Sequence, residues 1–156
     1  MTSHNTDGQP APDEHQRFAQ YLQDLAGVRE TDEADLVAAV LRDPDQVMAQ
    51  SAVIRHLDNR AANLLPLPDQ RFEDWAHAMA SQISELDFLT RRLHEWTMLR
   101  LITMGERWAV EEVTTASDWF QRKAVETVTT PAVLTLLATA GRTRRVRAAA
   151  NRRLHR

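Results

Sequence analysis

The residues of this sequence best suited to chemistry are seven arginines that follow Gly141 without an acidic residue among them. They are Arg142, Arg144, Arg145, Arg147, Arg152, Arg153 and Arg156. Clustered guanidinium groups bind phosphates or an acidic partner by electrostatic attraction. The rest of the chain holds 12 basic and 22 acidic side chains, so the formal net charge of −3 conceals a basic end on an acidic body. Such an asymmetry indicates an interaction surface.

The spacing of these arginines predicts a final helix that follows Thr143 as its N-cap. Its apolar face is formed by Val146, Ala150 and Leu154, and arginines flank this face on both sides. Together with two basic residues further up the chain, they make up the candidate partner-binding set: Arg122, Lys123, Arg144, Arg145, Arg147, Arg152 and Arg156. A structural role stays open, because a terminal helix needs a polar outer face and its cations can pair with the acidic body.

Other patterns that carry chemistry are absent or unspecific. The chain has no cysteine, and its six histidines lack the spacing of a metal site. It contains neither a glycine-rich phosphate loop nor a Gly-x-Ser-x-Gly turn. Carboxylates at Glu111, Glu112 and Asp118 stand near Trp108 and Trp119, and an aromatic wall of this kind can raise a carboxylate pKa. Core anchoring is the more common role of such tryptophans, so we predict no catalytic residue, no metal and no cofactor.

Hydrophobic periodicity predicts an all-α fold, with a disordered lead over residues 1–12 and one helical domain over 13–156. The expected helices cover 13–26, 32–41, 44–64, 69–104 (as one helix or as two that break at Ser81 or Ser84), 106–115, 118–128, 131–140 and a last helix that begins after Thr143. Caps are expected at Thr31, Asp43, Ser84, Ser117, Thr130 and Thr143, with Pro44 and Pro131 in first helical positions and Gln46 completing a capping box. Gly27, Gly105 and Gly141 are expected to end helices.

An internal repeat is visible when the second helices of successive pairs are compared. Each carries a large–small–large apolar ladder at helical spacing: Met48 and Ala52; Phe120, Ala124 and Val128; Val146, Ala150 and Leu154. A small central residue allows a partner helix to approach closely. The stretch Leu134–Leu154, with Val146-Arg147 ahead of Ala150, resembles a short HEAT-like repeat, and Leu36–Leu57 is similar. The resemblance covers roughly half the chain and implies a short α-solenoid of about four antiparallel helix pairs plus an N-terminal helix; an irregular helical bundle is the alternative.

A second resemblance concerns residues 117–125, Ser-Asp-Trp-Phe-Gln-Arg-Lys-Ala-Val. This stretch looks like part of the HEAT-like alkylpurine DNA glycosylases, in which an aromatic pair precedes a basic, apolar helix. The likeness covers nine residues, and the catalytic carboxylate of that family has no counterpart that we can place. It therefore supports only an alternative hypothesis, a nucleic-acid-binding protein or a reduced glycosylase-like enzyme.

The leading expectation is a non-enzymatic adaptor or regulatory protein. We expect it to bind a protein partner through the concave surface of its second helices and its arginine-rich last helix. Self-association into a homo-oligomer is a third hypothesis. The polar start and the lack of a long apolar run or of thiols predict a cytoplasmic protein that does not bind membranes.

Overall fold

The computed structural model describes residues 13–156, and every regular element in this part of the chain is an α-helix. The nine helices are α1 (Glu14–Ala26), α2 (Glu30–Val40), α3 (Gln46–Leu64), α4 (Arg71–Ile83), α5 (Asp87–Thr103), α6 (Val110–Thr114), α7 (Asp118–Thr127), α8 (Pro131–Ala140) and α9 (Arg144–Leu154). Residues 13–156 contain no β-strand, which confirms the predicted all-α class. The disordered lead predicted over 1–12 lies outside the described residues.

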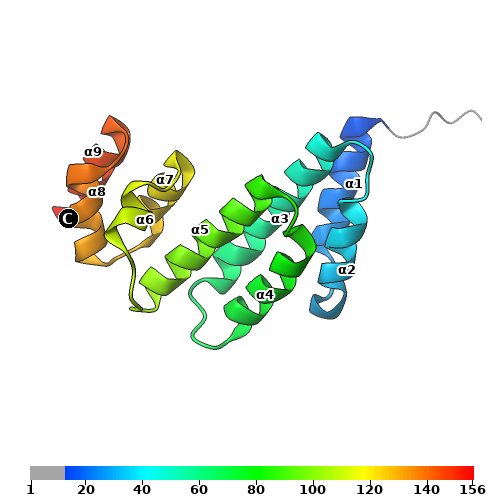
Figure 1. Ribbon diagram of the computed structural model, residues 1–156, viewed down its shortest axis with the longest axis horizontal. Helices are drawn as coiled ribbons and strands as arrows, with labels where there is room; N and C mark the ends of the chain where they lie inside the picture. The colour runs from blue at the N-terminus through cyan, green and yellow to red at the C-terminus, as the bar shows by residue number, and fades with distance from the viewer. Residues whose placement is uncertain (1–12) are drawn as a thin grey trace, which may run out of the picture.

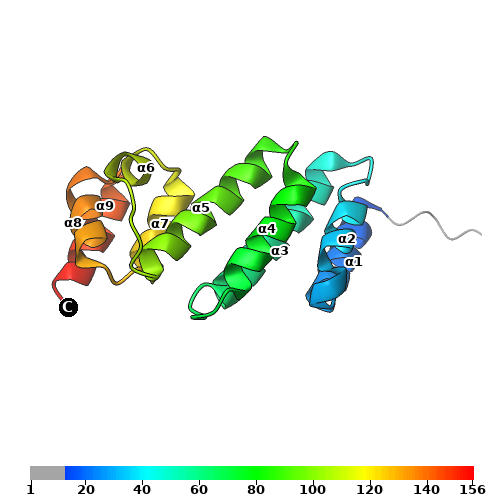
Figure 2. The same ribbon diagram turned by 60° about the horizontal axis from the view of Figure 1, so that its bottom comes forward.

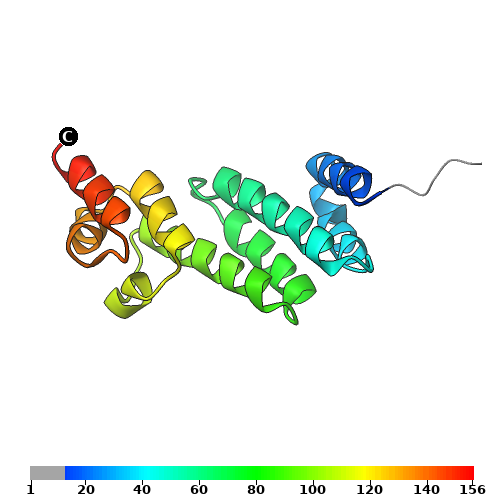
Figure 3. The ribbon, with the colours of Figure 1, turned by 90° about the horizontal axis from the view of Figure 1, so that it is seen from above.

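The helices form two rows along an elongated molecule (Figures 1 and 3). In the first row, called the odd row below, α1, α3, α5, α7 and α9 contact one another in chain order. In the second row, α2 packs against α4 and the short α6 packs against α8. Figure 2 shows α1 and α9 at opposite ends of the molecule. The odd row therefore offers one continuous face built from five helices.

The ladders predicted from the sequence lie in the core. The small residues at their centres, Ala52, Ala124 and Ala150, are fully buried. Phe120 and Val146, the large residues that precede two of them, are also buried, and the helices that carry them, α7 and α9, are in direct contact. A methyl group at the centre of each ladder leaves room for the neighbouring helix.

Several predicted helix ends are confirmed. Ser117 accepts a hydrogen bond from the Phe120 amide at 3.1 Å, and Thr143 accepts one from the Val146 amide at 3.1 Å, as N-caps do. Pro131 occupies the first position of α8. The open question over residues 69–104 is resolved as two helices, because α4 ends at Ile83 and α5 begins at Asp87.

Other predicted caps are wrong. The helix expected to begin at residue 32, after Thr31, begins two residues earlier, at Glu30, and its N-cap Arg29 makes no side-chain cap hydrogen bond. Asp43 does not cap α3; Asp45 does, by accepting from the Met48 amide at 3.1 Å. Thr130 is the N-cap residue of α8, as predicted, but its side chain makes no cap hydrogen bond. Ser84 ends α4 instead of capping α5.

The error at Asp43 has a tertiary cause. Its carboxylate accepts from the Tyr21 hydroxyl at 2.6 Å and from Arg17 Nε at 3.1 Å, both on α1, as well as from the Asp45 amide. Hydrogen bonds from Tyr21 and Arg17, more than 20 residues away, occupy the carboxylate oxygens of Asp43 that the local pattern assigned to the first turn of α3. Asp45 therefore caps this helix.

The helix predicted over 106–115 is only Val110–Thr114. Gly105 has φ +74°, the left-handed conformation that ends α5 as expected. The four residues after it run as a non-helical segment before α6 begins.

A buried arginine fixes the loop between α3 and α4. Arg100, on α5, donates to the carbonyl oxygens of Leu65, Leu67 and Asp69 at 2.7, 2.6 and 2.8 Å. Its Nε also donates to Glu73 at 2.8 Å. This proline-containing loop lacks helical partners for its carbonyls, so the guanidinium group supplies them and holds the two rows in register.

Candidate partner-binding surface

Buried polar contacts fix the position of α9 beside α7. The fully buried Gln121 side chain donates to the Val113 carbonyl at 2.9 Å and accepts from the Arg142 amide at 2.8 Å. At Gly141, just before this amide, a Cβ atom would lie 2.6 Å from the Leu137 carbonyl oxygen. Glycine is therefore needed at this turn, and the turn sets which side of α9 faces α7.

The result is a groove between α7 and α9, called the α7–α9 groove below. It has a volume of about 330 Å³ and a floor that includes Val125 and Val146. Three exposed arginines line it, Arg122 from α7 and Arg145 and Arg152 from α9. None of the three guanidinium groups has a hydrogen bond or an ion pair with another residue of the described chain. Three unpaired cations thus surround one hollow.

The other residues of the predicted set lie outside this groove. The Nζ atom of Lys123 lies 3.5 Å from Oε2 of Glu126 and 5.9 Å from the centre of the Trp96 ring. Glu126 itself also lines the groove. Arg147 donates to the Gly141 carbonyl at 2.7 Å, which gives it a structural role. Arg144 and Arg156 are exposed and do not line the groove. The structure therefore brings together three of the seven predicted residues.

The arginines after Gly141 form few ion pairs with the acidic residues earlier in the chain. Among the described residues, only Arg142 of the seven arginines after Gly141 forms an ion pair with a carboxylate, with Asp118 at 3.6 Å. Arg142 also donates to the Ala116 carbonyl at 3.1 Å, and Arg153 donates to the Val125 carbonyl. The two arginines that the predicted set left out, Arg142 and Arg153, thus stabilise the packing of the last helices, as Arg147 does.

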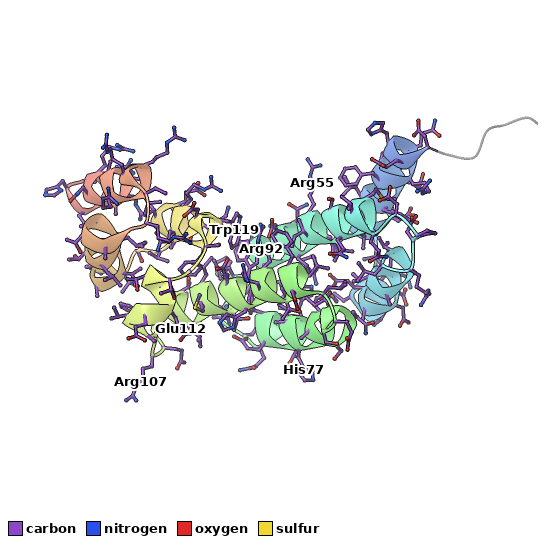
Figure 4. All side chains as sticks on the ribbon, turned by 45° about the horizontal axis from the view of Figure 1, so that its top comes forward. Arg55, His77, Arg92, Arg107, Glu112 and Trp119 are labelled. Carbon is purple, nitrogen blue, oxygen red and sulfur yellow. The ribbon has the colours of Figure 1, made fainter. Side chains whose placement is uncertain are left out.

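The middle of the odd row carries a cluster that the sequence did not predict. Arg92, on α5, donates to Asp58 on α3 at 2.6 Å, and its guanidinium carbon lies 4.0 Å from the centre of the Trp119 ring. Trp96 donates to the same carboxylate at 2.8 Å and packs edge-on against Trp119. In Figure 4, Arg55, Arg92 and Trp119 lie toward the upper side. The Asp58 carboxylate neutralises Arg92, so this cluster joins α3, α5 and α7 rather than adding to the positive charge.

The carboxylate beside an aromatic wall, which was considered from the sequence and not favoured, is not formed by the residues named for it. Trp119 is half-buried against Arg92 and Trp96, whereas Glu111, Glu112 and Asp118 are exposed. Figure 4 shows Glu112 on the side of the molecule away from Trp119. Trp108 and Trp119 pack against the core, as predicted from the sequence.

A second unpredicted cluster lies at the other end of the molecule, around the buried Glu33 of α2. Its carboxylate accepts from His56 Nε2 at 2.6 Å, from Trp75 Nε1 at 2.9 Å and from Arg60 Nε at 3.1 Å. Burial raises the pKa of Glu33, but these hydrogen bonds outweigh it and lower the pKa from 4.5 to about 2. The carboxylate is therefore ionised at neutral pH and acts only as an acceptor.

No family profile, curated protein or solved structure matches the chain. Across residues 13–156, no three His, Asp or Glu side chains are grouped as a metal site would require. None of the helices described is both long and apolar enough to span a membrane.

Proposed function

We propose that this chain is a HEAT-like adaptor that acts by binding rather than by catalysis, and that its α7–α9 groove binds an acidic segment of a partner protein in the cytoplasm. The observation that carries the proposal is the set of three unpaired arginines, Arg122, Arg145 and Arg152, around one groove. A carboxylate can accept two parallel hydrogen bonds from one guanidinium group, which suits such a set to acidic side chains.

The apolar floor of the groove supports a protein partner. Val125 and Val146 lie between the arginines, so a partner can bury aliphatic carbon there while its carboxylates meet the guanidinium groups. Interfaces combine a buried apolar centre with a polar rim in this way. The groove has this composition, with an apolar floor and a polar rim that are each formed by a few side chains.

The overall charge favours an acidic protein segment over a nucleic acid. Nucleic acids carry a phosphate charge at every step, and their affinity depends on many cations along an extended track. On α5, the next helix of the odd row, Arg92 is paired with Asp58 and adds no unpaired cation to the basic track. The body beyond it is acidic and repels a polyanion that extends past the groove.

The test compares two double substitutions on the same helix. Arg145→Glu with Arg152→Glu reverses two charges in the groove, and Arg144→Glu with Arg156→Glu makes the same charge change outside it. Poly-L-glutamate serves as an acidic polypeptide probe and a short DNA duplex as the nucleic-acid probe, each titrated between about 50 and about 200 mM salt.

We expect the groove variant to weaken poly-L-glutamate binding by at least about tenfold and the control variant to weaken it far less. Equal losses in both variants would show a diffuse charge effect and remove the groove from the proposal. Tighter binding of the duplex than of poly-L-glutamate, with a steep salt dependence, would replace the proposal with nucleic-acid binding. Sedimentation of the chain alone at the same concentrations controls for self-association.

A further inference from the structure

A second cavity lies on the odd row, at the end opposite the α7–α9 groove. This α1–α3 cavity has a volume of about 490 Å³ and lies between the carboxyl-terminal halves of α1 and α3. The α1 wall is apolar and consists of Leu22, Leu25 and Ala26. The α3 wall is polar and consists of Arg55, His56, Asn59, Arg60 and Asn63.

His56 gives the cavity an unusual chemical feature. The side chain is only 5% exposed, and Nε2 faces the Glu33 carboxylate at 2.6 Å. Every buried side-chain nitrogen and oxygen atom in the described chain has a hydrogen-bond partner. His56 Nδ1 has no partner among the described residues, so this atom is not one of the buried atoms. Nδ1 is therefore not enclosed by protein, and it opens onto the α1–α3 cavity that His56 lines.

The hydrogen bond between His56 Nε2 and Glu33 determines which ring nitrogen is left for a ligand. Glu33 is ionised at neutral pH and accepts from three donors, so the Nε2 atom of His56 carries the hydrogen. Nδ1 is then the ring nitrogen that remains for a hydrogen bond with a ligand. A ligand in the cavity must present a polar group to this atom, and a peptide backbone offers both a donor and an acceptor.

The remaining polar groups of the wall form a stripe along α3. Arg55, Asn59 and Asn63 follow one another at intervals of four residues, and therefore lie on one side of the helix. All three are exposed, and none has a hydrogen-bond partner or an ion pair within the described chain. Each asparagine amide offers two donors and an acceptor, which matches the alternating N–H and C=O groups of a peptide.

We propose that the α1–α3 cavity binds a short peptide segment that combines an aliphatic with an acidic side chain. A backbone polar group of the segment hydrogen-bonds to His56 Nδ1, and Asn59 and Asn63 hydrogen-bond to its backbone. The aliphatic side chain packs on Leu22 and Ala26, and the carboxylate meets Arg55. The inference rests on the proposed function in one respect: it makes the partner a protein with a second contact on the odd row.

The experiment uses the full chain with ¹⁵N-labelled histidine. The probe is the capped tripeptide Leu-Glu-Leu, compared with capped Leu-Lys-Leu, inorganic phosphate and a short single-stranded DNA. Nuclear magnetic resonance follows the ring nitrogens of His56, which are recognised by their loss in the variant His56→Gln. We expect Leu-Glu-Leu to shift the Nδ1 resonance saturably in the millimolar range and Leu-Lys-Leu to bind more weakly.

Matched variants test the location. Asn59→Ala with Asn63→Ala should weaken Leu-Glu-Leu binding by about tenfold, whereas Gln50→Ala, on the same helix outside the cavity, should leave it unchanged. Circular dichroism checks that the double variant folds. If it does not, Arg55→Met replaces it, and this substitution should abolish the preference for Leu-Glu-Leu over Leu-Lys-Leu.

Three results would overturn the inference: no shift of Nδ1, a shift produced equally by phosphate or DNA, or equal losses in the cavity and control variants. The variant Arg145→Glu with Arg152→Glu separates this outcome from failure of the proposed function. It should retain the tripeptide-induced shift, because the two sites lie at opposite ends of the odd row.

Discussion

Replacement of Glu33 by glutamine tests the electrostatics of the buried cluster between α2, α3 and α4. The Glu33 carboxylate accepts from His56, Trp75 and Arg60, and its side chain is 4% exposed. Glutamine has nearly the same shape, but one of its two polar atoms is an NH₂ group that faces donors. At least one hydrogen bond to the charged group is therefore lost and one donor is left without a partner.

The magnitude follows from the pKa. Lowering the pKa of Glu33 from 4.5 to about 2 corresponds to about 3 kcal/mol of stability at neutral pH. Because the folded state holds this carboxylate in its ionised form, the stabilisation is complete above about pH 4.5. It is lost progressively as the pH falls from 4.5 toward 2. Glu33→Gln should therefore unfold about 3 kcal/mol more easily at neutral pH.

Urea unfolding followed by tryptophan fluorescence measures this difference across a pH series. The gap between the wild-type chain and Glu33→Gln should narrow below about pH 4.5, where the wild-type carboxylate begins to lose its advantage. Glu30→Gln is the control, because Glu30 is 70% exposed and lies 3.4 Å from the same Arg60; an exposed pair contributes about 0.5 kcal/mol. A gap that stays constant with pH, or that equals the effect of Glu30→Gln, would refute the reasoning.

Two further predictions concern positions that fix the helices. Arg100→Met should cost about 3 kcal/mol in urea unfolding, because the carbonyl groups of the loop 65–69 lose their donors; an effect below about 1 kcal/mol would mean that water replaces the guanidinium group at no cost. Gly141→Ala should cost about 2 kcal/mol by forcing a Cβ atom against the Leu137 carbonyl oxygen. Its control, Gly27→Ala, has its nearest contact at 3.8 Å and should change stability by less than about 0.5 kcal/mol, so similar losses at both glycines would contradict the steric explanation.

The sequence predicts correctly the features that depend on residues a few positions apart, such as helical periodicity and N-caps. The apolar ladders centred on Ala124 and Ala150 depend on helical periodicity alone, and both lie in the core. The caps at Ser117 and Thr143 depend on a side chain and an amide three residues apart, and both are present. The cap expected at Asp43 is wrong because Tyr21, distant in sequence, accounts for one of its hydrogen bonds.

The polar clusters could not be predicted for the same reason. The hydrogen bonds of Glu33 join it to residues 23, 27 and 42 positions away. No local pattern distinguishes this glutamate from the solvated acids beside it, such as Asp32 and Asp35. A weak signal does exist, since Glu33 and Val37 share the buried side of α2 at a spacing of four residues. A carboxylate on an apolar face requires donors from other helices, but the sequence does not say which ones.

The candidate arginines illustrate how far charge alone carries a prediction of function. Seven arginines after Gly141 look equivalent in the sequence, yet Arg142, Arg147 and Arg153 donate to backbone carbonyls and serve the packing of the last helices. Arg145 and Arg152 instead share a groove with Arg122. Their mutual repulsion is tolerated in the free protein because water screens exposed charges. An acidic partner removes that repulsion and pairs each solvated charge with a carboxylate. The groove arginines therefore gain more free energy from binding than the arginines that already donate to backbone carbonyls.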